Sequence, residues 1–170
     1  MNKTFYLLLA FIITINVQAQ DVFNAARSNN IAELETLIKN GTDLNQTDQR
    51  GFTPLILAVY NNGSEAAKLL LKNKANPDAQ DASGNTALMG AVFKNNLEMI
   101  NLLIDNRADI NQVNSNGASA LIFAATFGNQ QIITTLLAAG ADKTIKDNRG
   151  KTALDHAILQ ENKEIIKSLK

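Results

Sequence analysis

A period of 33 residues runs through most of this chain of 170 residues. Glycine recurs at that spacing, and a Thr or Ser follows each glycine after one intervening residue. The glycines are Gly51, Gly84, Gly117 and Gly150; an alanine column contains Ala25, Ala58, Ala91, Ala124 and Ala157; a leucine column contains Leu37, Leu70, Leu103, Leu136 and Leu169. A fixed period in this range is typical of stacked supersecondary units. The sequence therefore predicts a solenoid built from five similar units.

Each unit is predicted to be a tight turn followed by two short helices. In the first complete unit, Gly51 supplies the positive φ that such a turn needs. Thr53 is a hydroxyl N-cap, and Pro54 stands at the first helical position, where its missing N–H costs nothing. We expect the first helix over residues 54–60 and the second over residues 64–72.

The columns and the chain ends define how the units stack. Alanine marks the places where helices of adjacent units come so close that a larger side chain would clash, and leucine fills the core between units. The first unit lacks the Gly-x-Thr turn, and the last stops in its second helix. In that last helix, Lys170 stands where earlier units have a large apolar residue. We therefore expect both end units to be caps with a polar outer face.

The repeated motifs resemble the ankyrin repeat. Gly51-Phe52-Thr53-Pro54-Leu55-Ile56-Leu57-Ala58 and Leu136-Leu137-Ala138-Ala139-Gly140-Ala141-Asp142 carry this resemblance. It implies an all-α ankyrin repeat solenoid of five stacked helix pairs with β-turn fingers. The pairs would be an N-terminal cap (21–47), three full repeats (about 48–80, 81–113 and 114–146) and a truncated C-terminal repeat (147–170). The histidine of the family motif is replaced by Ile56, Met89, Ile122 and Asp155, and its proline remains only at Pro54.

The first residues have the three-part layout of a secretory signal peptide. Lys3 precedes an apolar run over residues 5–15, and Val17 and Ala19 occupy the −3 and −1 positions of a cleavage site. We expect a signal peptide over 1–19, a mature chain over 20–170, and an exported product that is periplasmic or secreted, with no membrane association after cleavage. The alternative is an uncleaved membrane anchor, although the apolar run is shorter than the roughly 20 residues that span a bilayer.

The composition leaves little material for catalysis or metal binding. The chain has 16 basic and 16 acidic residues, no cysteine and a single histidine, His156. Zero net charge disfavours nucleic acid as a partner. Without cysteine, and with one histidine beside Asp155, a nucleophile–base pair or a metal site is not indicated. We expect no catalytic residue, no metal and no cofactor.

Acidic residues also recur with the period. One column contains Asp48, Asp81, Asn114 and Asp147, and another contains Asp43, Asp109 and Asp142. Such rows could bind cations or act as acids and bases. Asp and Asn also accept hydrogen bonds from the backbone of their own turns. Because both columns follow the fold period, we favour the structural interpretation.

Four aromatic residues stand where ankyrin families usually contact partners, at the turns and at the end of the first helix. These residues are Phe52, Tyr60, Phe93 and Phe127, and the polar rim expected around them is Gln49, Arg50, Asn85, Lys94, Asn148, Arg149 and Lys151. Exposed aromatics are frequent binding hot spots. We expect the four rings to form one exposed strip along the concave side. The alternative is that they pack on neighbouring turns and cover the core.

The sequence therefore predicts a monomeric, non-catalytic module that is exported and binds a protein partner through its concave face. Resemblance to exported bacterial ankyrin proteins implies an accessory stress-protection factor or a toxin-immunity protein of the periplasm. Two alternatives are an effector delivered to a host and, from another class, an enzyme.

Overall fold

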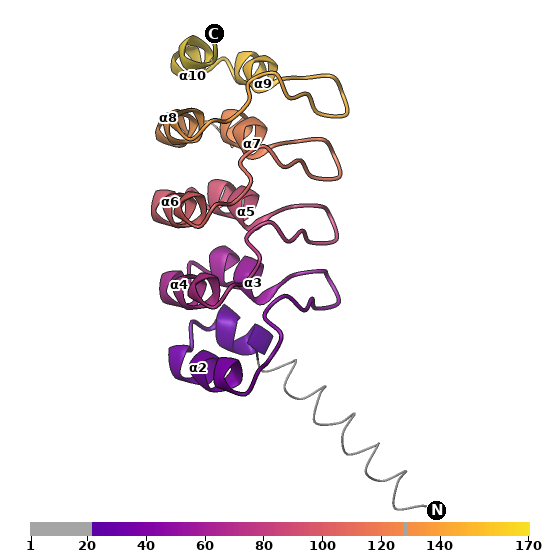
Figure 1. Cartoon of the computed structure of the whole chain (residues 1–170). Coiled ribbons are helices and arrows are strands. Elements are labelled where there is room, and N and C mark those ends of the chain that lie inside the picture. The colour runs from indigo at the N-terminus through magenta and orange to yellow at the C-terminus, as the bar shows by residue number, and fades with distance from the viewer. Residues whose placement is uncertain (1–21, 128) are drawn as a thin grey trace, which may run out of the picture.

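The computed structural model describes residues 22–127 and 129–170; the predicted signal peptide lies outside these ranges. Helix pairs stack one upon another, and a loop projects from each repeat on the same side (Figure 1). The helices are residues 22–27, α2 (Ile31–Lys39), α3 (Pro54–Tyr60), α4 (Ser64–Lys72), α5 (Ala87–Phe93), α6 (Leu97–Asp105), α7 (Ala120–Phe127), α8 (Gln130–Ala138), α9 (Ala153–Leu159) and α10 (Lys163–Leu169). This arrangement confirms the all-α repeat solenoid.

Local caps fix where the helices begin. The Thr53 hydroxyl accepts a hydrogen bond from the Ile56 N–H at 3.2 Å, which satisfies one of the free donors at the start of α3. Asparagine N-caps do the same at α2, α6, α8 and α10, as Asn96 does for α6. The bounds predicted for the helices over 54–60 and 64–72 are confirmed by α3 and α4.

The projecting loops, which we call fingers, are tight turns that begin at Asp48, Asp81, Asn114 and Asp147. Gly51 has a φ of 76°, as the sequence predicted for this turn. A Cβ at Gly51 would also lie 2.6 Å from the backbone nitrogen of Ala82 in the next finger. That nitrogen donates to the Arg50 carbonyl at 3.1 Å. Glycine therefore permits both the turn and the close approach of adjacent fingers.

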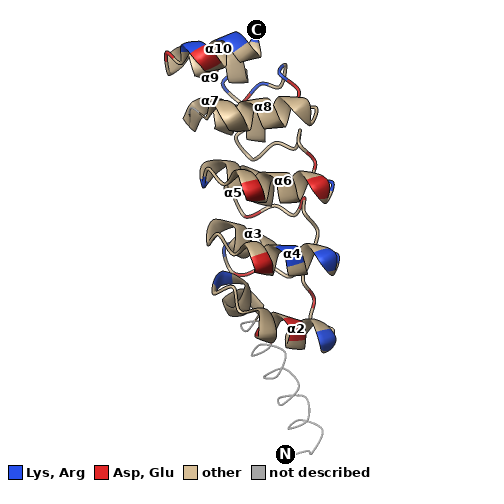
Figure 2. Ribbon diagram, turned by 90° about the vertical axis from the view of Figure 1, so that its left-hand side faces the viewer, with Lys and Arg blue, Asp and Glu red and all other residues tan. Residues whose placement is uncertain are grey.

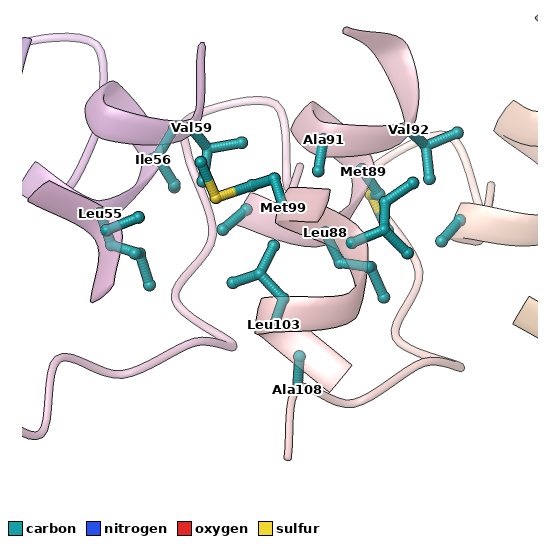
Figure 3. Packing of buried hydrophobic residues seen from close by; sticks show 14 of the residues in the cluster. Leu55, Ile56, Val59, Leu88, Met89, Ala91, Val92, Met99, Leu103 and Ala108 are labelled. Atoms are coloured by element: carbon teal, nitrogen blue, oxygen red, sulfur yellow. The ribbon is translucent and has the colours of Figure 1, made fainter. Parts of the chain in front are cut away.

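The core is continuous through the stack. All five residues of the alanine column have 0% exposure, and the leucine column is buried throughout. Figure 3 shows how α3, α5 and α6 meet: Met99 extends from α6 toward Val59, and Leu103 lies beside Leu88. Buried apolar side chains thus hold each helix pair to the next, as the two columns predicted.

The loops after the second helices carry a second link between repeats. The Asp78 carboxylate accepts the Asp109 N–H at 2.7 Å, and Asn111 accepts the Asp142 N–H at 2.8 Å. Within its own loop, Asp109 accepts the Asn111 N–H at 2.9 Å. The structural role predicted for the column with Asp43, Asp109 and Asp142 is confirmed, because each carboxylate accepts from the nitrogen two residues on.

The last repeat departs from the expected polar cap. Ile158 and Leu159 at the end of α9 are 51% and 60% exposed. Ala26, Val59, Val92 and Ala125, at the positions equivalent to Ile158, are all buried. The prediction of a polar outer face is wrong for α9. The position that is apolar and buried in the earlier repeats remains apolar in the last described repeat, where it is exposed. By contrast, α10 carries both acidic and basic residues (Figure 2).

Among the helices of the described ranges, none combines the length and the apolar character needed to cross a membrane.

Candidate protein-binding groove

The fingers and the helices that follow them, α3, α5, α7 and α9, lie on one side of the stack (Figure 1). We call the surface between them the inner groove, because two hollows lie on it. The first, of about 790 Å³, lies at the first finger and α3, with Phe52, Tyr60 and Arg50 among its lining residues. The second, of about 260 Å³, lies between α7 and the last finger, with Phe123, Phe127 and Arg149 in its walls.

The aromatic side chains form two clusters. Phe52 and Tyr60 have ring centroids 5.7 Å apart. Phe93 and Phe127 meet edge to face at 5.2 Å and 79°, and Phe123 lies 6.0 Å from Phe127. Edge-to-face contact is a preferred geometry for aromatic rings. Within the described residues, every ring pair falls inside one of these clusters, so the single continuous strip that we expected is divided into two.

Exposure separates the two clusters. Phe93 and Phe127 are 53% and 55% exposed, whereas Phe52 and Tyr60 are half-buried against the core. The Tyr60 ring lies over Gly90 of the next repeat, where a Cβ would come within 3.3 Å of it. Burial, and secondarily the charge of Asp81, raises the pKa of the Tyr60 hydroxyl. The expectation of full exposure is therefore wrong for Phe52 and Tyr60, which also cover the core.

The polar rim is only partly free to bind. Gln49, Arg50, Asn148 and Arg149 line the hollows from exposed finger tips, and Lys94 is exposed at the end of α5. Asn85 instead links two fingers, since it donates to Asp81 and accepts from the Asn114 amide at 2.9 Å. The Lys151 side chain is half-buried. Asn85, Phe93, Lys94 and Lys151 are outside the walls of both hollows.

The turn carboxylates hold the fingers in shape. Asp48 accepts the N–H groups of Arg50 and Phe52 at 2.8 and 2.9 Å. Asn114 makes the equivalent two bonds with an amide oxygen, so the turn does not require a charge. The structural interpretation of this column is confirmed. In residues 22–127 and 129–170, no three His, Asp or Glu side chains lie close enough to hold a metal ion together.

The sequence did not predict the contact that His156 makes. Its Nε2 lies 2.8 Å from Oδ2 of Asp147, whereas its neighbour Asp155 accepts from the Thr152 N–H in a capping box. Both His156 and Asp147 line the second hollow. The backbone N–H of Lys151, followed by His156, lowers the pKa of Asp147. The sequence could have indicated this contact. His156 stands at the position equivalent to Leu57, which lines the first hollow, and it follows the finger of its own repeat by one helical turn.

This pair orients the finger, and the hydroxyl group among the described lining residues of the second hollow is not directed at it. The hydroxyl of Thr126, which lines the same hollow, donates to the Ile122 carbonyl at 2.8 Å. General-base catalysis requires the base within hydrogen-bond reach of the proton that it removes. The arrangement can thus hold a charge and shape a surface, and binding is the chemistry that it supports.

Comparison with known families agrees with the fold. A family model described as "Ankyrin repeats (3 copies)" matches residues 22–114 and residues 97–170. The chain belongs to the ankyrin repeat family, whose members are generally protein-interaction modules and typically non-catalytic. No curated protein matches this chain.

Proposed function

We propose that this chain is an exported, non-catalytic ankyrin repeat protein that binds one partner protein in its inner groove. The observation that carries the proposal is the Phe93–Phe127 pair, whose rings meet at 5.2 Å while each remains more than half exposed. Large aromatics in such positions supply most of the binding energy in many interfaces. The two rings come from adjacent repeats, so one partner can contact both.

The competing interpretation is that the rings only cover the core. It accounts for Phe52 and Tyr60, which are half-buried, but poorly for the other pair. A ring that contributed only by burial would lose most of its benefit when more than half of its surface stays in water. Phe127 also lines the second hollow beside Arg149, which gives a partner both an apolar wall and a charge.

Export rests on the apolar run over residues 5–15 and the small residue Ala19 at the cleavage position. Mass spectrometry of the protein recovered from its native compartment tests this part. We expect a mature N-terminus at Gln20. A protein that keeps residues 1–19 would be a membrane-anchored one instead.

Binding is tested by capture from periplasmic extract with the tagged mature chain. We expect one dominant partner at stoichiometric amounts, which Phe127→Ala loses and the control Ile158→Ala retains. Ile158 is a matched control because it is a comparably exposed apolar residue outside both hollows, at a position that faces the end of the stack. The identity of the captured partner also distinguishes the two roles proposed for this chain. An enzyme as the partner would indicate a stress-protection factor, and a toxin would indicate an immunity protein. Equal capture by both variants would contradict binding in the groove.

A further inference from the structure

The two hollows share the same combination of side chains. Each has an aromatic wall, formed by Phe52 and Tyr60 in the first and by Phe123 and Phe127 in the second. Each also has an arginine on the finger tip above that wall. Arg50 and Arg149 occupy the same position in their fingers, two residues after the turn aspartate. The two fingers between them carry Ser83 and Asn116 at that position.

Both arginines are available to a partner. Their side chains are exposed, and within residues 22–127 and 129–170 neither forms an ion pair. The turn carboxylates of the same two fingers are already hydrogen-bonded. Asp48 and Asp147 each accept two backbone N–H groups of their own turn, and Asp147 also contacts His156. The rim of each hollow thus offers a free guanidinium group beside apolar rings.

The second column of acidic residues lies away from the hollows, and Asp81, whose charge reaches Tyr60, accepts two N–H groups of its own turn. Asp43, Asp78, Asp109 and Asp142 belong to the loops after the second helices, and none of them lines a hollow. Although the whole chain has no net charge, Arg50 and Arg149 are the charged side chains of the two hollows that, within the described residues, form neither a hydrogen bond nor an ion pair. Charge complementarity therefore favours an acidic occupant.

The chemistry of arginine narrows the occupant further. A guanidinium group binds a carboxylate through two parallel hydrogen bonds and stacks on aromatic faces. The second hollow, at about 260 Å³, is smaller than the roughly 300–1,000 Å³ of common small-molecule sites. It suits a single large side chain of another protein.

Building on the proposed function, we infer that the inner groove binds an acidic protein surface. At each hollow, that surface presents a large apolar side chain next to an Asp or Glu. The carboxylates pair with Arg50 and Arg149, and the apolar side chains pack on the rings below. The two contacts are three repeats apart, about 30 Å at roughly 10 Å between packed helices. A partner surface of ordinary size spans that distance.

Random peptides displayed on phage and selected on the immobilised mature chain test this inference. Selected peptides are then synthesised, and their affinities are measured by fluorescence anisotropy with the wild type, Arg50→Glu, Arg149→Glu, Phe52→Ala, Phe127→Ala and Arg107→Glu. Arg107 is the matched control, because it is an exposed arginine outside both hollows. Arg149→Gln removes the charge without reversing it and serves if the glutamate variant does not fold.

We expect the peptides to carry Asp or Glu beside an aromatic residue or leucine. Their Kd should rise at least tenfold in Arg50→Glu or Arg149→Glu, stay unchanged in Arg107→Glu, and rise with salt because the guanidinium groups are exposed. Peptides that need Phe127 but lack acidic residues would overturn this inference and leave the proposed function standing. If no selected peptide depended on Phe52 or Phe127, both would be contradicted.

Discussion

Nε2 of His156 lies 2.8 Å from Oδ2 of Asp147, and this contact joins α9 to the finger that precedes it. The same carboxylate accepts the backbone N–H groups of Arg149 and Lys151 at 2.9 Å. Asp147 therefore fixes both the turn and the position of Arg149 at the rim of the second hollow. An ionised carboxylate can only accept, so the imidazole Nε2–H is the donor in this contact.

The first prediction concerns acid stability. The Lys151 N–H, and next His156, lower the pKa of Asp147 below its ordinary value of 3.8. A lowered pKa means that the ionised group stabilises the fold above its ordinary pKa, and that this contribution is lost as pH falls through the lowered value. Urea melts from neutral pH to about pH 3 should show a smaller acid loss in Asp147→Asn.

Asparagine is a suitable replacement because Asn114 already makes the same two turn bonds in its own finger. Asp142 and Asp155, whose pKa values are also lowered, are common to both proteins and cancel in the comparison. An identical acid dependence in wild type and variant would show that the lowered pKa of Asp147 contributes nothing to stability.

The second prediction concerns the leucine column. Leu103 is fully buried between repeats, so Leu103→Ala should lower the free energy of unfolding by about 2–5 kcal/mol. Leu169 is also buried, with 3% exposure, but its repeat packs against a neighbouring repeat on one side only. Leu169→Ala should therefore cost less. Denaturant melts that found the two equally damaging would refute this view of the last repeat.

The third prediction concerns a cap that crosses between repeats. Gly63, the N-cap residue of α4, has no side chain, and the side-chain Oδ1 of Asn29 accepts the Ala66 N–H at 2.8 Å in its place. Asn29→Ala should lower the free energy of unfolding by about 1 kcal/mol more than Asn62→Ala. Asn62 is the control because its φ of 55° matches the 54° of Asn29, and it caps no helix. Equal thermal shifts in the two variants would exclude this cap.

The fourth prediction separates two aromatic residues at equivalent positions. Phe93 is 53% exposed, so Phe93→Ala should change the free energy of unfolding by about 0.5 kcal/mol. Tyr60 covers Gly90, so Tyr60→Ala should cost about 1–2 kcal/mol. Chemical denaturation of both variants measures the difference. A larger loss for Phe93→Ala would place that ring in the core.

Short-range signals made the fold predictable. The bounds of α3 and α4 depend on a Thr-Pro start and an Asn-Asn-Gly break, which act within a few residues. The roles of the alanine and leucine columns depend only on the period. The family histidine is absent, yet the fingers keep their shape because Asp48 and its equivalents accept the turn N–H groups directly.

Contacts between repeats were harder to predict. Tyr60 is half-buried because the next repeat has Gly90 at the position where Leu57, Phe123 and His156 stand in other units. The pairing of His156 with Asp147 depends on a side-chain direction that sequence spacing does not fix. Ile158 is apolar like the buried Val59 and Val92 at the equivalent positions, and its exposure could not be read from that pattern.

The central claim is that the groove around Phe127 binds protein, and one paired measurement tests it. The affinity for the captured partner and the free energy of unfolding are measured for wild type, Phe127→Ala and the control Ile158→Ala. We expect Phe127→Ala to weaken binding by about 2 kcal/mol or more, as truncation of a hot-spot aromatic does. Its free energy of unfolding should change by only about 0.5 kcal/mol, because the ring is 55% exposed. Unchanged affinity, or unfolding of the variant, would contradict the claim.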